Sequence, residues 1–116
     1  MSNDVQDESH TIGRWLIERA AHTPHGVAID DRGGTIDYAD LARRARELAD
    51  RLAEAGFGPG SRIATLAGNS IDHVVLFFGC ALVGAAFVPL SWRQSTRELV
   101  DTLGHCSINV LLRGFE

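Results

Sequence analysis

The feature that most constrains this chain is the alternation of short apolar runs with helical segments along the sequence. A first segment with helical periodicity covers residues 12–21. After it, the apolar runs alternate with further helical segments and lie at 27–29, 62–66, 85–90 and 108–112. Such alternation predicts an α/β fold with a mostly parallel sheet and helices on its faces. The runs are continuously apolar, which is typical of strands covered on both faces.

Local signals in the first half predict a hairpin followed by a long helix. Residues 35–36 follow the turn Arg32-Gly33-Gly34, so we expect a small hairpin with the run at 27–29. Asp37 is predicted to cap a helix of about five turns. Its apolar stripe consists of Leu41, Ala45, Leu48, Leu52 and Ala55. The opposite face is rich in charge, which is typical of a solvated surface.

Residues 56–61, GFGPGS, resemble a phosphate-binding loop in their glycine content. Such a loop needs its glycines after a strand and before a helix, so that backbone N–H groups and the helix N-terminus point at the anion. Here the order is reversed, because Gly56 follows a helix and a strand begins at Arg62. We therefore predict a turn in which Gly56 ends the helix in the left-handed conformation.

Four local signals define the second half of the chain. Residues 67–70, AGNS, lie between a strand and a helix, but they hold one glycine and no lysine, so a plain helix cap is favoured over an anion site. The helix over 71–83 is apolar on almost every side, which predicts cover on more than one side. Pro89 cannot donate to a ladder, which predicts a strand end or a sheet edge. Ser95 with Glu98 predicts a capping box at the start of a short helix.

Composition disfavours some classes of function. A formal net charge of −4 argues against nucleic-acid binding. The 11 basic residues other than histidine are all arginine, so the chain contains no lysine. Residues 1–10 are predicted to be a disordered polar tail rather than a signal peptide, and the longest apolar run, 74–80, is too short to span a bilayer. Cys80 and Cys106 are predicted to be thiols in a reducing compartment, which favours a cytoplasmic location.

Two longer motifs carry a family resemblance. Residues 36–41 read IDYADL, residues 82–90 read LVGAAFVPL, and residues 60–63, GSRI, lie between them. In this order and spacing they resemble the N-terminal part of the AMP-forming acyl-CoA synthetases, fatty-acyl-CoA ligase-like members of the adenylate-forming or AMP-binding superfamily. The resemblance implies that residues 11–116 are the N-terminal α/β portion of an incomplete, larger AMP-binding domain.

The chain also departs from the family pattern. Asp37 replaces a hydroxyl residue, Ser61 an aspartate and Val83 an alanine. The sequence also ends before the family's lysine-containing phosphate loop, before its acidic motif for ribose and magnesium, and before its C-terminal catalytic lysine. For the motifs that are present, the resemblance implies structural roles, with Tyr38 and Leu41 anchoring the long helix to the sheet.

Few residues suggest chemistry. Arg93 is the single cofactor-binding candidate, because it follows the strand ending near Pro89 and ligands gather at the carboxyl ends of strands in open α/β sheets. Asp30-Asp31 resemble the acidic pair of a receiver domain, but that fold also needs a lysine, so a polar hairpin turn is favoured. The five histidines share no ligand spacing, and the serines have no adjacent base. We therefore predict no catalytic residue and no metal site.

Two functions fit these observations. The resemblance implies a parent enzyme that uses ATP, magnesium and CoA to convert a carboxylate to an acyl-adenylate and then to a thioester. This chain would be an inactive scaffold segment whose partner is the remainder of the synthetase. The alternative is a free-standing, non-catalytic interaction or regulatory module that binds a related synthetase chain. For the scaffold segment, the apolar helix and the last strand predict exposed apolar surface through which the chain self-associates, whereas a well-folded monomer with a specific partner would favour the module.

Overall fold

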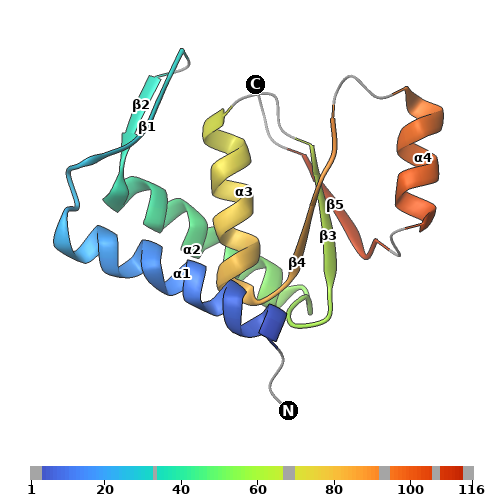
Figure 1. Ribbon diagram of the computed structural model, residues 1–116, viewed down its shortest axis with the longest axis horizontal. Coiled ribbons are helices and arrows are strands. Elements are labelled where there is room, and N and C mark those ends of the chain that lie inside the picture. The colour runs from blue at the N-terminus through green and yellow to red at the C-terminus, as the bar shows by residue number, and fades with distance from the viewer. Residues whose placement is uncertain (1–3, 33, 67–69, 92–94, 106–107, 114–116) are drawn as a thin grey trace.

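The computed structural model describes residues 4–32, 34–66, 70–91, 95–105 and 108–113. Its elements follow one another in the predicted order (Figure 1). The helices are α1 (Asp4–His22), α2 (Tyr38–Glu54), α3 (Ser70–Val83) and α4 (Thr96–His105). The strands are β1 (Val27–Asp31), β2 (Gly34–Asp37), β3 (Arg62–Leu66), β4 (Ala86–Pro89) and β5 (Val110–Arg113). The predicted mixed α/β class is therefore confirmed.

The main sheet is parallel and has the strand order β4-β3-β5. In its register, Ile63 of β3 lies opposite Phe87 of β4 and Val110 of β5. Strands β1 and β2 form a separate antiparallel hairpin, which confirms the predicted hairpin. Because the three main strands are parallel, their carboxyl ends meet at one edge of the sheet.

Pro89 lies on an edge strand of the described sheet, as predicted. The N–H of Ala86 donates to the carbonyl of Ser61 at 2.8 Å, and the N–H of Leu90 donates to that of Thr65 at 2.8 Å. Since backbone groups alternate between the two sides of a strand, the Pro89 nitrogen points away from β3. Proline is therefore tolerated here because no ladder hydrogen bond is lost.

Helix α1 begins earlier than the sequence suggested. The predicted start at Thr11 is wrong, because the helix already begins at Asp4. Acidic residues at positions 4, 7 and 8 favour an early start, since negative charge is stabilising near the positive end of a helix dipole. The end of α1 at His22 agrees with the prediction, and Pro24 follows within two residues.

Helix α2 begins and ends as predicted. The Asp37 carboxylate accepts a hydrogen bond from the N–H of Asp40 at 2.8 Å, which caps the first turn. Beyond the other end, Gly56 and Gly60 have φ angles of 93° and 91°, a region that only glycine enters without strain. The N–H of Phe57 reaches back to the carbonyl of Leu52 at 2.9 Å. Residues 56–61 are therefore a helix-to-strand turn, as predicted.

Tyr38 has a different neighbour from the one expected. Its ring lies edge-on to Trp15 of α1 with centroids 6.2 Å apart, and the guanidinium carbon of Arg19 lies 5.5 Å from the ring centre. Leu41 is buried in a cluster with Leu16 and Ile36. The prediction that Tyr38 and Leu41 anchor α2 to the main sheet is therefore wrong, because they anchor it to α1 and the hairpin.

Helix α3 lies between the α1–α2 pair and the main sheet (Figure 1). It packs most extensively against α2 and also contacts α1 and β4. The α2–α3 contact is close at Gly79, where an added Cβ would lie 2.5 Å from the Cδ2 atom of Leu48. The apolar sequence of α3 is therefore explained by cover on several sides, as predicted.

Helix α4 is capped as predicted but is sparsely packed. The Ser95 N–H donates to the Glu98 carboxylate, and the Glu98 N–H donates to the Ser95 hydroxyl, both at 3.2 Å. The helix makes no extensive contact with another described element. Val100 on α4 is 60% exposed and Leu111 on β5 is 45% exposed. Among the described helices, none combines the length and apolar character that crossing a membrane requires.

Candidate functional site

The carboxyl edge of the parallel sheet is the first candidate site, because ligands bind there in open α/β sheets. The three strands end at this edge with the residues Leu66 of β3, Pro89 of β4 and Arg113 of β5. Arg93, the ligand candidate from the sequence, lies outside the described residues. Its contribution to this edge therefore stays a prediction.

Thr65 is a polar residue at this edge that sequence reasoning missed. It is the fourth residue of β3 and is only 1% exposed. Its hydroxyl has no hydrogen-bond partner among the described residues. A buried hydroxyl without a partner costs free energy, so its presence needs an explanation. The available signal was a threonine inside an otherwise apolar run, RIATL.

Replacing Thr65 with valine is expected to raise the free energy of unfolding by about 1 kcal/mol, because the variant keeps the shape and removes the unpaired hydroxyl. Urea unfolding of the two chains measures the difference. A lower stability of the Thr65→Val chain would contradict the prediction and indicate that the hydroxyl has a partner.

The acidic pair Asp30-Asp31 belongs to the hairpin. Asp31 accepts a hydrogen bond from the N–H of Arg32 at 2.7 Å, and Asp30 accepts one from the Thr35 hydroxyl at 3.3 Å. These contacts are local and stabilise the turn. Among the described residues, no group of three or more histidine, cysteine, aspartate or glutamate side chains is placed to hold a metal ion.

Cys80 is a free thiol in the core, whereas Cys106 lies outside the described residues. Cys80 is 0% exposed and belongs to the cluster around Ile63 and Leu52. Burial raises the pKa of its thiol from 9.0 to about 12. Thiolate is the reactive form, so this cysteine is poorly suited to nucleophilic or redox chemistry.

The Cys80 thiol is expected to resist a disulfide reagent at pH 8 in the folded chain and to react in urea. Because its folded pKa is raised, the protonated thiol stabilises the fold fully below pH 9, and this stabilisation is lost as the pH rises from 9 toward 12. A Cys106→Ser chain leaves one thiol to follow by absorbance. Equal reaction rates in the folded and unfolded chain would contradict this protection.

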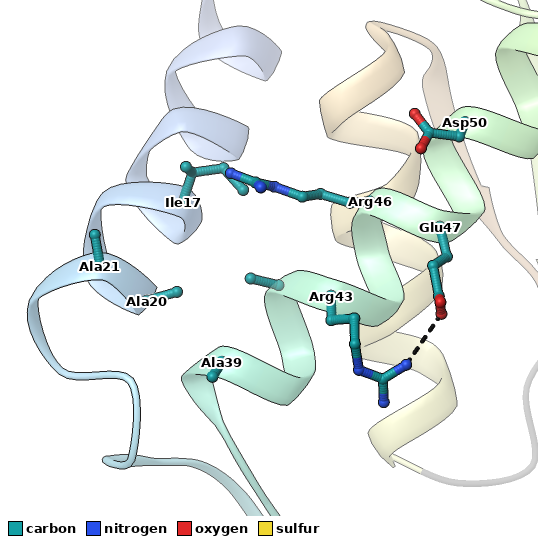
Figure 2. A pocket seen from close by; sticks show the side chains of 9 residues that line it. Ile17, Ala20, Ala21, Ala39, Arg43, Arg46, Glu47 and Asp50 are labelled. Carbon is teal, nitrogen blue, oxygen red and sulfur yellow. Dashed lines mark hydrogen bonds and ion pairs between the residues drawn. The ribbon is translucent and has the colours of Figure 1, made fainter.

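A groove between α1 and α2 is the second candidate site (Figure 2). Its volume is about 440 Å³. The α1 wall is uncharged and consists of Ile17, Ala20 and Ala21. The α2 wall consists of Ala39, Ala42, Arg43, Arg46, Glu47 and Asp50. Sequence reasoning identified the charged face of α2 but not the groove, because the groove exists only where α1 packs beside it.

Ion pairs organise the charges at one end of this groove. Asp40 pairs with Arg43 and, at 3.0 Å, with Arg44. Arg43 also lies 3.2 Å from Glu47, as Figure 2 shows. Burial alone would raise the pKa of Asp40, but the two arginines outweigh it and lower that pKa below its usual value.

Known proteins resemble this chain in both fold and sequence. A family described as AMP-binding enzyme matches residues 16–115. Feruloyl-CoA synthase of Amycolatopsis sp is 38% identical over 101 residues, which are 87% of this chain and 21% of that protein. The fatty acyl CoA synthetase of Mycobacterium tuberculosis superposes with a TM-score of 0.81 at 31% identity, covering 89% of this chain and 21% of that one.

A second solved structure agrees. The O-succinylbenzoate coenzyme A synthetase of Bacillus subtilis, in complex with AMP, superposes with a TM-score of 0.79 at 30% identity. The match covers 88% of this chain and 27% of that one. The chain thus spans about a fifth to a quarter of the length of these proteins. Because the family match extends over most of its residues, this chain belongs to the AMP-binding enzyme family.

Proposed function

We propose that this chain is the N-terminal scaffold segment of an ATP-dependent acyl-CoA synthetase and is inactive alone. In the proposed parent reaction, a carboxylate oxygen attacks the α-phosphorus of ATP and pyrophosphate leaves. The CoA thiol then attacks the acyl-adenylate carbonyl, which forms the thioester and releases AMP. The family match and the acyl-CoA-forming relatives support this assignment.

The observation that most strongly supports the scaffold role is that the described sheet has an unpaired edge on each side. Among the described residues, β4 and β5 each pair with β3 alone, so each has one free edge. Helix α4 makes no extensive contact with its neighbours, and Val100 on it is 60% exposed. Free edges and exposed apolar side chains are the features that a further layer of the parent domain would cover.

We propose that ATP and magnesium bind the remainder of the parent synthetase rather than this chain. The sequence has no lysine, which is the residue that contacts the β- and γ-phosphates in phosphate-binding loops. The described residues also offer no cluster of carboxylates for the metal. We therefore assign no chemical step to a residue of this chain, and ATP, magnesium and CoA to the remainder of the synthetase. We further propose a cytoplasmic location for the parent, where its thiols stay reduced.

A hybrid enzyme tests the scaffold role. The matching 101-residue segment of the Amycolatopsis feruloyl-CoA synthase is replaced by the corresponding residues of this chain. The hybrid is expected to fold and to form its CoA thioester, measured by chromatography of the product. A matched hybrid with Ile63→Ala is expected to yield less folded enzyme, because Ile63 is fully buried in β3. A folded hybrid that forms no adenylate would overturn the proposal.

Adding the chain to an intact relative distinguishes the scaffold role from the alternative, a regulatory module. As a scaffold segment, the chain is expected to leave the rate of thioester formation by full-length feruloyl-CoA synthase unchanged. A specific, saturable change in that rate would instead favour the interaction module.

A further inference from the structure

We propose that the α1–α2 groove is a docking surface for a second copy of this chain, with the two α2 helices side by side in antiparallel orientation. The residues involved form one stripe on α2, called here the α2 stripe: Ala39, Ala42, Arg43, Arg46, Glu47 and Asp50. This surface differs from the free edges of the sheet that support the proposed function.

The charges of the α2 stripe are arranged in two blocks. Residues three or four apart lie on the same side of a helix, so the charged side chains follow one line along the groove. In chain order they are Arg43, Arg46, Glu47 and Asp50, two positive followed by two negative. Read in the opposite direction, the order is two negative charges followed by two positive charges. Two copies of the stripe that run antiparallel therefore place each charge opposite a charge of the other sign.

Antiparallel pairing gives each of the four charged side chains of the stripe an oppositely charged neighbour in the second copy. With the two-fold axis between positions 46 and 47, Arg43 lies opposite Asp50 of the second copy, and Arg46 lies opposite Glu47 of the second copy. Each contact then occurs twice by symmetry, as in any two-fold interface. Parallel pairing would instead place like charges together, so the stripe selects one orientation.

The groove also has the shape that close helix packing needs. Both walls carry alanines, and small side chains let two helix backbones approach closely (Figure 2). The α1 wall, Ile17, Ala20 and Ala21, has no charge that competes with the stripe. A space of about 440 Å³ is large enough to receive side chains of another helix.

Two residues of the stripe have no ion-pair partner in the part of the chain that the structure describes. Among the described residues, no ion pair involves Arg46 or Asp50, although Arg43 pairs with Asp40 and Glu47. Figure 2 shows the Arg46 side chain extending across the groove toward Ile17. Exposed pairs within one helix contribute little to stability, so they can be exchanged for contacts with a second copy at small cost.

Charge reversal tests this arrangement. One variant carries Arg43→Glu and Arg46→Glu, and the other carries Glu47→Arg and Asp50→Arg. Each has four like charges in its stripe, so each is expected to dimerise at least about tenfold more weakly than the original chain. Mixed in equal amounts, the two are expected to recover a one-to-one dimer, measured by sedimentation and native mass spectrometry.

Two control variants show whether a loss of dimerisation comes from the charges of the stripe or from a fold damaged by charge substitution. Arg14 and Glu18 of α1 are exposed and lie outside the groove, so exchanging their charges is expected to leave dimerisation unchanged. A fourfold variant with all stripe charges reversed is again complementary to itself. It is expected to form its own dimer but not to combine with the original chain in the antiparallel arrangement.

Three outcomes would overturn the proposal. The first is an original chain that stays monomeric up to its solubility limit. The second is self-association that persists unchanged in both reversed variants, as association through the sheet edges would. The third is failure of two folded, reversed variants to combine. None of these outcomes decides the scaffold role, because the hybrid enzyme does not depend on the stripe.

Discussion

Replacing Gly79 with valine is expected to lower the free energy of unfolding by about 2 kcal/mol or more. A Cβ at this position would lie 2.5 Å from Cδ2, 2.9 Å from Cγ and 3.1 Å from Cβ of Leu48. Rotating the tip of Leu48 cannot relieve the last two contacts, so α2 and α3 must separate. These two helices share the most extensive contact in the fold, and separating them also loosens their packing. Urea unfolding measures the loss.

Two further chains isolate the cause of the Gly79 effect. Leu48→Ala removes Cδ2 and Cγ, the two atoms nearest to the added Cβ, so in that background Gly79→Val is expected to cost at least about 1 kcal/mol less. Gly104 on α4 has no atom within 4 Å of an added Cβ. Gly104→Ala is therefore expected to be neutral or to stabilise the chain by up to about 1 kcal/mol through helix propensity. Equal costs for Gly79→Val with and without Leu48 would contradict the close contact.

Replacing Ile63 with alanine is expected to lower the free energy of unfolding by about 2–5 kcal/mol. Ile63 is 0% exposed and lies in the central strand, opposite Phe87 and Val110. Its side chain packs in the cluster with Leu52 and Cys80, so truncation leaves a cavity between the sheet and the helices. Chemical denaturation followed by circular dichroism gives the change.

Leu111→Ala is the matched control for Ile63. Leu111 lies in β5, the neighbouring strand, but is 45% exposed. Its truncation is expected to cost less than about 1 kcal/mol, because little apolar surface is lost from the core. If the two substitutions had equal effects, the placement of the core between the sheet and α3 would be wrong.

Features with a local cause could be predicted from the sequence. The Asp37 cap, the glycine turn at 56–61 and the Ser95–Glu98 capping box each depend on residues within one turn of one another. The parallel sheet followed from the alternation of strands and helices, which leaves few topologies open. The position of Pro89 at an edge followed from its missing N–H.

Features that depend on contacts distant in sequence could not be predicted. Tyr38 was expected to face the sheet, but the path of the chain brings α1 beside it. The start of β5 was placed too early, because the Asn109 side chain accepts a hydrogen bond from the N–H of Arg62 at 2.6 Å and the strand begins only at Val110.

Two features of the candidate sites also depend on contacts between segments that are distant in sequence, so the sequence did not predict them. The α1–α2 groove requires the packing of two helices whose sequences give no sign of their relative position. Thr65 was missed because a single threonine in an apolar strand is common, and its burial depends on segments distant in sequence, such as the strands β4 and β5 on either side of β3. Arg93 lies outside the described residues, so its role stays a prediction.

Pyrophosphate release by the purified 116-residue chain is the most direct test of the scaffold role. The chain is incubated with ATP, magnesium, a set of aromatic and fatty carboxylates, and CoA. An intact feruloyl-CoA synthase serves as the positive control. We expect release by the chain that cannot be distinguished from the enzyme-free blank. Release above that blank, dependent on the carboxylate, would contradict the account, because it would place the ATP-handling residues within this chain.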